Sequence, residues 1–155
     1  MDALDVYDYL RSRLGMDAER IVVFGRSMGS GPACFLAKNR PCGALILFTP
    51  FKSISALVSE RVKVGSLGWD FFPNDSHLEA LTIPICIIHG REDTVIPYSH
   101  AQSIYSNSLP LSPLVHMTIS DNMDHNTFNM LADVVEPSVR FMERIGLKDR
   151  DGNRE

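Results

Sequence analysis

The chain has 155 residues, of which 45% are hydrophobic and 22% charged, a composition typical of one globular domain rather than of a disordered chain. The net charge is -4 and the lysines and arginines are scattered, which excludes the basic surface that nucleic-acid binding requires. No apolar run approaches the roughly 18 residues of a membrane-spanning helix, so we expect no transmembrane segment. The 3 cysteines form no CxxC pair and give no zinc-binding pattern, which indicates buried free thiols in a reducing compartment such as the cytoplasm.

The first half of the chain alternates between helical and strand patterns. Apolar residues at helical spacing begin at Leu4, and Gly15 supplies the stop. Residues 21–24 are continuously apolar and predict a short strand that is buried on both faces. A helix over residues 28–39 and a second buried strand over residues 44–48 follow.

The second half continues the alternation after a less regular stretch. Strands are predicted over residues 85–88 and 114–119, with a helix over residues 99–109 between them. A final helix over residues 128–145 contains Pro137, which should end or kink a turn there. Alternating helices and buried strands predict an α/β fold with a mostly parallel sheet that helices cover on both faces. Such sheets place their functional sites at the C-terminal ends of the strands.

The first candidate for chemistry is the sequence Gly25-Arg26-Ser27-Met28-Gly29, which matches G-x-S-x-G between a predicted strand and a helix. A sharp strand-to-helix turn exposes the serine hydroxyl, and its close packing favours glycine at both flanking positions. Ser27 is therefore the predicted nucleophile, and the N–H of Met28 at the helix start is one of two predicted oxyanion-hole donors. A glycine-flanked helix cap explains the five residues equally well if they are taken alone.

A carboxylate follows the third predicted strand in the segment His89-Gly90-Arg91-Glu92-Asp93. We expect Asp93 to accept a hydrogen bond from the base and to fix its tautomer. Two alternatives remain: Asp93 only caps the turn, or the neighbouring Glu92 is the acid.

The predicted base is His125, in the loop that precedes the last helix. A neutral imidazole there can take a proton from a serine near pH 7. Of the other histidines, His116 lies in a strand pattern and is expected to be structural, and His89 to brace its own loop. His77 and His100 are expected to be exposed.

Three segments together resemble the α/β-hydrolase superfamily: GRSMGSGPA, HGREDTVIP and the loop ending in MDHNTF. The resemblance covers nearly the whole chain and keeps the family order of serine, acid and histidine. It implies that Ser27, Asp93 and His125 form a catalytic triad. The Phe72-Pro73-Asn74 segment, the longer run HGREDTVIPYSHA and the short cap look like the branch that contains membrane-associated protein depalmitoylases.

The resemblance implies a serine hydrolase that cleaves ester or thioester bonds through an acyl-enzyme, without metal or organic cofactor. The substrate would be a small molecule or a lipid acyl group, including that of an S-acylated protein, in the cytoplasm or at a membrane surface reached through an upstream segment. Alternatives are a serine aminopeptidase-like or lipase-like hydrolase, and a weakly active or inactive binding scaffold without the oxyanion loop.

The resemblance also implies a domain plan. Residues 1–147 would form the C-terminal portion of the fold, with a small cap over residues 52–81, and residues 148–155 a polar tail. The aromatic residues of this cap, Trp69, Phe71 and Phe72, are equally suited to packing in the core and to contacting an acyl chain.

This chain departs from the family pattern in two places. Asp124 stands where the family has glycine before the histidine, and its carboxylate either interacts with His125 or points to solvent. The strands and the glycine-rich oxyanion loop that precede the first helix in family members are absent, so we expect a truncated α/β-hydrolase fold. The strand from Ile21 to Phe24 would then lie at a sheet edge without lysine or proline, which predicts self-association, most simply as a two-fold dimer.

Overall fold

The computed structural model of the chain describes residues 2–62, 70–79, 81–112 and 114–147. Its centre is a four-stranded sheet in the order β1-β2-β3-β4, and each neighbouring pair is parallel. The strands are β1 (Val22–Arg26), β2 (Ala44–Phe48), β3 (Ile85–Gly90) and β4 (Val115–Ser120). The predicted α/β architecture with a parallel sheet is confirmed.

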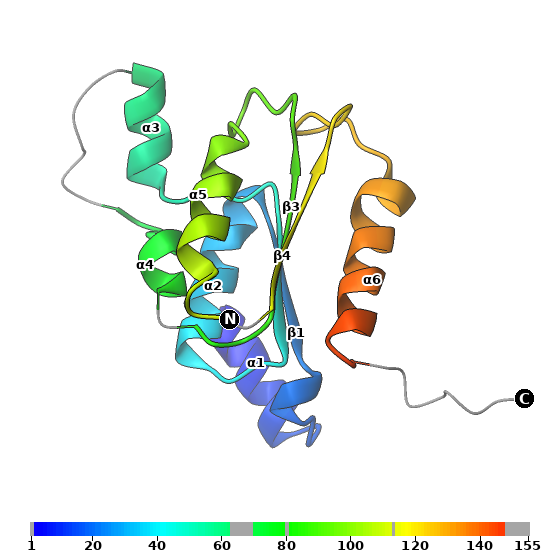
Figure 1. Cartoon of the computed structure of the whole chain (residues 1–155). Helices are drawn as coiled ribbons and strands as arrows, with labels where there is room; N and C mark the ends of the chain where they lie inside the picture. Colours follow the sequence, from blue (N-terminus) through cyan, green and yellow to red (C-terminus); the bar gives the residue numbers. More distant parts are fainter. Residues whose placement is uncertain (1, 63–69, 80, 113, 148–155) are drawn as a thin grey trace, which may run out of the picture.

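Helices cover both faces of this sheet, as Figure 1 shows, with α6 on one side and α2, α4 and α5 on the other. The helices are α1 (Ala3–Ser12), α2 (Ser30–Asn39), α3 (Ile54–Val62), α4 (Asn74–Leu78), α5 (Ser99–Ser108) and α6 (Glu136–Arg144). Short 3-10 turns at Ala18–Arg20 and Ser27–Gly29 precede β1 and α2. None of the helices in the described part of the chain is both long and apolar enough to cross a bilayer.

The core divides into two layers because side chains alternate between the faces of a strand. Leu45, Leu47, Ile85 and Ile87 point toward α2 and α5 and are fully buried there. The intervening residues of the same strands pack under α6: Ile46, Phe48, Cys86 and Ile88. All residues of β2 and β3 are buried, as a continuously apolar parallel strand predicts.

The prediction that the first strand is buried on both faces is wrong. Phe24, on β1, is 50% exposed, because β1 is an edge strand and α6 packs over its neighbours. On the opposite face, α1 packs Tyr7 against Ile21, and Val23 joins the same cluster. One face of β1 is therefore covered, and the other is covered only in part, since Val22 packs against the cluster under α6 while Phe24 is exposed.

The predicted final helix over residues 128–145 is divided in the structure. It opens with a π-helical turn, Met130–Val135, whose first amides are capped by the Asn129 side chain. The regular helix α6 begins only at Glu136, so that Pro137 lies in its first turn. Helix α6 continues directly from the π-helical turn, and Pro137 removes one N–H that would otherwise bond back to that turn. The predicted disturbance at Pro137 is thus a change of helix type.

The segment between β2 and β3, less regular in its sequence pattern, contains two helices, α3 and the short α4. Of the aromatic residues there, Phe71 is 81% exposed and Phe72 packs directly on Gly31 of α2. Trp69 and the predicted polar tail over residues 148–155 lie outside the described residues.

Candidate active site

Ser27 lies at the C-terminal end of β1, on a strained turn into α2. Its φ is +50°, a left-handed conformation that residues other than glycine seldom adopt. Gly25 is required beside it, since a Cβ at that position would overlap Ala33 and the backbone of Ser30. A Cβ at Gly29 would meet nothing within 4 Å, so the predicted steric need for glycine at that flanking position is wrong.

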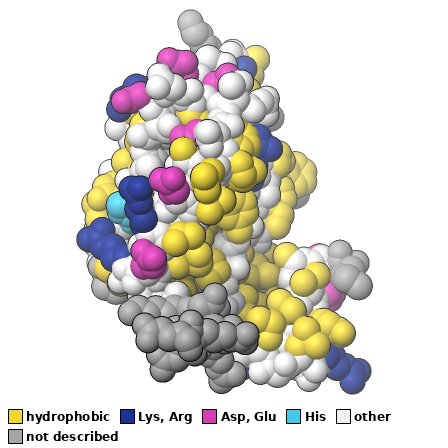
Figure 2. Space-filling model, turned by 90° about the vertical axis from the view of Figure 1, so that its right-hand side faces the viewer, with side chains coloured by type: hydrophobic (Ala, Val, Ile, Leu, Met, Phe, Trp, Pro, Cys, Tyr) yellow, Lys and Arg dark blue, Asp and Glu magenta, His cyan; other side chains and the backbone are white. Residues whose placement is uncertain are grey.

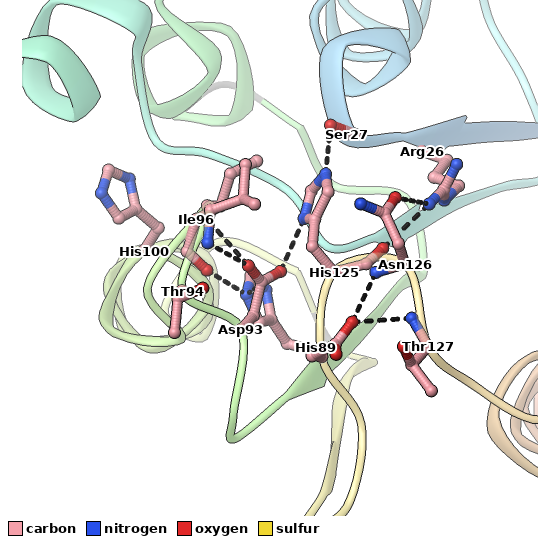
Figure 3. A network of polar contacts seen from close by, with 12 residues as sticks. Arg26, Ser27, His89, Asp93, Thr94, Ile96, His100, His125, Asn126 and Thr127 are labelled. Carbon is pink, nitrogen blue, oxygen red and sulfur yellow. Dashed lines mark hydrogen bonds and ion pairs between the residues drawn. The ribbon is translucent and has the colours of Figure 1, made fainter.

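The structure brings the three predicted side chains into one hydrogen-bonded chain, shown in Figure 3. Ser27 Oγ lies 2.9 Å from His125 Nε2, and His125 Nδ1 lies 2.7 Å from Asp93 Oδ2. Because a carboxylate only accepts, the proton of a neutral His125 ring lies on Nδ1, which leaves Nε2 free to accept the serine proton. Asp93 and His125 are 5% and 8% exposed, so both groups are shielded from water.

Asp93 is held by more than the imidazole. Its Oδ1 accepts the backbone N–H groups of Val95 and Ile96, each at 2.8 Å. Burial raises the pKa of this carboxyl, but hydrogen bonds from His89, the Ile96 amide and His125 lower it by more, to about 2. Asp93 therefore caps its turn and also accepts a hydrogen bond from the His125 imidazole, so the two roles predicted for it are compatible.

The competing carboxylates lie elsewhere. Glu92 is exposed, and Asp121 pairs with Arg91 at 2.6 Å. The Asp124 carboxylate neither contacts His125 nor simply points to solvent. Its Oδ1 accepts the backbone N–H groups of Asn126 and Thr127 at 2.7 Å, and these bonds lower its pKa. Asp124 thus builds the loop that carries His125.

The other histidines correct part of the sequence analysis. His77 and His100 are buried, so the prediction that both are exposed is wrong. His77 packs edge-on against Phe35, with ring centroids 5.7 Å apart. His100 accepts the Lys52 backbone N–H through Nδ1 at 3.1 Å and donates from Nε2 to Glu60 at 3.0 Å. Burial lowers the pKa of both rings.

His89 braces its loop, as predicted, and also reaches the acid. Its Nε2 donates to the Ile96 carbonyl at 2.8 Å and lies 3.5 Å from Asp93 Oδ2. His116 lies in β4 and is partly buried, as expected of a strand residue.

A buried polar pair behind the nucleophile was missed at the sequence level. Ser30 Oγ donates to the Ser27 carbonyl at 2.7 Å, and Asn74 Nδ2 donates to Ser30 Oγ at 3.1 Å and to the Phe51 carbonyl at 2.9 Å. Ser30 and Asn74 have no exposed surface. The pair ties α4 to the turn that carries Ser27. The Phe72-Pro73-Asn74 segment marked this region in the sequence, although not the role of the asparagine.

Helix α3 also holds the loop that carries Asp93. Arg61 Nη2 donates to the Val95 carbonyl at 2.7 Å and also to the Thr94 carbonyl. The region between β2 and β3 is therefore attached both to the nucleophile turn and to the loop that carries Asp93. Within the described residues, no group of three or more histidine, cysteine, aspartate or glutamate side chains is placed to hold a metal ion.

Met28 follows Ser27 in the 3-10 turn Ser27–Gly29, and its side chain is 56% exposed. The first N–H groups of a helical turn have no partner within the helix and point along its axis. This position suits a donor to an oxyanion, and that role of Met28 stays a prediction.

Comparisons with known proteins agree with this fold. No family model matches the chain. Alpha/beta hydrolase domain-containing protein 17B of Xenopus laevis is 34% identical over 134 residues, which are 86% of this chain and 45% of that protein. The human protein of the same name is 29% identical over 136 residues, 87% of this chain and 46% of that protein. The chain spans slightly less than half the length of these curated relatives.

Among solved structures, the chain resembles the esterase domain of a Rhodothermus marinus protein. The TM-score is 0.68 at 14% identity, over 92% of this chain and 67% of that domain. At this identity the likeness concerns the fold alone. The chain therefore has the fold of these α/β-hydrolase structures, and over 86% of its length it is similar in sequence to an alpha/beta hydrolase domain-containing protein.

Proposed function

We propose that this chain carries the catalytic residues of a serine hydrolase that cleaves ester or thioester bonds. The observation that carries the proposal is the hydrogen-bonded chain from Ser27 Oγ through His125 to Asp93, with separations of 2.9 and 2.7 Å. A serine, a base and an orienting acid within hydrogen-bond distance are what nucleophilic catalysis by a hydroxyl requires.

In the proposed reaction, His125 Nε2 takes the proton of Ser27 as Oγ attacks the acyl carbon. The ionised Asp93 stabilises the imidazolium that forms. The bond to the leaving alcohol or thiol then breaks, and that group takes the proton from His125. Water attacks the resulting acyl-serine with His125 again as base, and the carboxylic acid and free Ser27 are released. We propose the Met28 N–H as one donor to the oxyanion in both halves of the reaction.

Hydrolysis of short acyl esters and thioesters tests this function. We expect Ser27→Ala to abolish turnover, because the nucleophile is gone. Ser106→Ala, which removes an exposed serine of α5, should keep the wild-type rate. Equal turnover by the wild type and Ser27→Ala would refute the proposal.

For the substrate, we propose a fatty acyl group on a protein thiol, so that the enzyme acts as a protein depalmitoylase-like thioesterase. The family resemblance supports this class. Residues 52–81, which we propose as a small cap, present the exposed Phe71 as a contact for such a chain. Phe71→Ser should then lower kcat/KM for long-chain thioesters and leave acetyl thioesters unaffected. A parallel loss for both chain lengths would contradict this substrate class.

We further propose a cytoplasmic setting at the membrane surface, where S-acylated proteins reside, and self-association through β1. The three cysteines are buried free thiols, which suits a reducing compartment. Strand β1 is at the sheet edge with Phe24 half-exposed, and an unpaired apolar edge is a template for pairing with a second strand. In an antiparallel pairing of two copies, the two Phe24 side chains would become cross-strand neighbours.

A further inference from the structure

Arg26, the residue before Ser27, reaches across to the loop that carries His125. Its Nη2 donates to the His125 backbone carbonyl at 2.9 Å and to Asn126 Oδ1 at 3.2 Å. Figure 3 shows the arginine beside both residues. These contacts join segments 99 and 100 residues apart in the sequence. Together with the bond between Ser27 and His125, they tie the loop to the end of β1.

The guanidinium also packs against two aromatic rings. It lies over the ring of Phe128 at 5.3 Å and near the ring of Phe48 at 5.9 Å, distances at which a cation is attracted to an aromatic face. These two rings pack edge-to-face at 5.0 Å, and Phe48 is fully buried at the end of β2. Arg26 is therefore held at a defined place between the sheet and the loop, although part of its side chain is exposed.

The rest of the loop shows why such a support is needed. At one end Met123 is buried, and its carbonyl accepts the Glu92 N–H at 3.2 Å. At the other end Phe128 rests on Phe48. Between these two ends, the Asp124 carboxylate bonds only to Asn126 and Thr127. These bonds fix the conformation of the loop but do not connect it to another segment. Arg26 supplies an external attachment at His125 itself.

We propose that Arg26 is a positioning residue that fixes the backbone of His125, so that Nε2 stays within hydrogen-bond distance of Ser27 Oγ. This role rests on the proposed serine-hydrolase function, since it places the base of that reaction. Positioning has a large effect on rate, because a displacement of about 1 Å in a reacting group can cost on the order of 10²-fold. The alternative, that Arg26 binds an anionic substrate, is less favoured because Nη2 already donates to the loop and the guanidinium lies over the Phe128 ring.

Kinetics on an uncharged short acyl ester separates these roles. Arg26→Met keeps an apolar stem and loses the donors, and we expect a kcat about 10- to 100-fold lower with KM changed less than about twofold. Arg26→Lys keeps the charge without the planar guanidinium, and its kcat should lie between those of the wild type and Arg26→Met. Arg40→Met is the control, because Arg40 also donates to a side chain, the carboxylate of Asp8, but binds no residue of the His125 loop. A raised KM with an unchanged kcat would overturn the positioning role.

A second measurement does not depend on turnover. The proton shared by His125 Nδ1 and Asp93 should give a deshielded resonance, assigned by its loss in His125→Ala. In Arg26→Met it should broaden or exchange faster with water, while Arg40→Met should keep it; if Arg26→Met does not fold, Arg26→Lys takes its place. An unchanged resonance would overturn the proposal whatever the kinetics. A wild type without turnover but with the expected change in resonance would refute the proposed function and keep this role of Arg26.

Discussion

The candidate site has two halves, the acid with the base and the nucleophile with its proposed oxyanion donor. They differ in how deeply their residues are buried and how many neighbours hold them. The acid and the base, Asp93 and His125, are 5% and 8% exposed and are bonded to several neighbours. Ser27 and Met28 follow the edge strand β1. In this half, Phe24 of β1 is 50% exposed and Met28 is 56% exposed. Figure 2, a view of the α6 side, shows hydrophobic side chains gathered over this face of the molecule.

The difference shows which part of the chemistry each half can supply. The acid–base half has fixed hydrogen-bond geometry and a carboxyl whose pKa is lowered to about 2, so it is ready to receive a proton from a serine. The nucleophile half has its strained turn and one proposed oxyanion donor, and its strand is paired on one side within the described residues. We therefore expect the acid–base half to be ready for proton transfer as it stands, and the single proposed oxyanion donor of the nucleophile half to limit the rate.

The largest effect should come from breaking the acid–base half. Asp93→Asn places an amide against His125 Nδ1, which favours the wrong imidazole tautomer, and acylation of Ser27 should slow about 10³- to 10⁴-fold. The measurement is the single-turnover rate with a chromogenic ester. Glu92→Gln, the neighbouring exposed carboxylate, serves as control and should react like the wild type. If Glu92→Gln is the slower variant, the acid has been assigned to the wrong residue.

A smaller effect should follow from the nucleophile half. With Met28 N–H as a single donor, turnover of short esters by the 155-residue chain should lie about 10²- to 10³-fold below the roughly 10 s⁻¹ typical of enzymes. Steady-state kinetics gives this rate directly. A turnover near 10 s⁻¹ would mean that another segment of the chain supplies a second donor, and the contrast between the halves would disappear.

The lowered pKa of Asp93 also makes stability depend on pH. Its folded pKa, about 2, lies below the unfolded value of about 4, so its contribution is complete above about pH 4 and is lost as the pH falls toward 2. The contribution is about 2 kcal/mol in the free energy of unfolding. Urea denaturation of Asp93→Asn between pH 5 and pH 2 should lack this loss, whereas Asp121→Asn, at an exposed carboxylate, should keep it. Equal slopes for wild type and Asp93→Asn would contradict the assignment.

The smallest effect concerns the open edge. We expect sedimentation at micromolar concentration to show a dimer, and Phe24→Lys to raise the dimer dissociation constant about tenfold or more by placing a charge on the edge strand. Phe71→Lys changes another exposed phenylalanine away from β1 and should leave association unchanged. A monomeric wild type with rapidly exchanging amides in β1 would show that the edge stays solvated.

Much of this site follows from local patterns in the sequence. The strands are short apolar runs, and Ser27, Asp93 and His125 each come after the end of one, so a parallel sheet brings them to the same edge. The same patterns fail where packing between distant segments decides. The burial of His100 depends on a backbone N–H 48 residues away, and that of His77 on the Phe35 ring.

The supports of the site are invisible to local patterns for the same reason. Arg26 and Asn74 act across 99 and 44 residues of sequence, respectively. An arginine within G-x-S-x-G or an asparagine after proline carries no local signal for such a contact. The exposure of Phe24 likewise depends on strand order and not on composition, since residues 21–24 are as apolar as those of the buried strand β2.

The central claim is that Ser27 is a nucleophile activated by His125 and Asp93, and covalent labelling tests it most directly. A fluorophosphonate probe incubated with the purified chain should add to one peptide, and fragmentation should place the adduct on Ser27. Labelling should be lost in Ser27→Ala and slowed at least 10³-fold in His125→Ala, which keeps the hydroxyl but removes the base. An adduct on another serine, or equal labelling of the wild type and His125→Ala, would contradict the account.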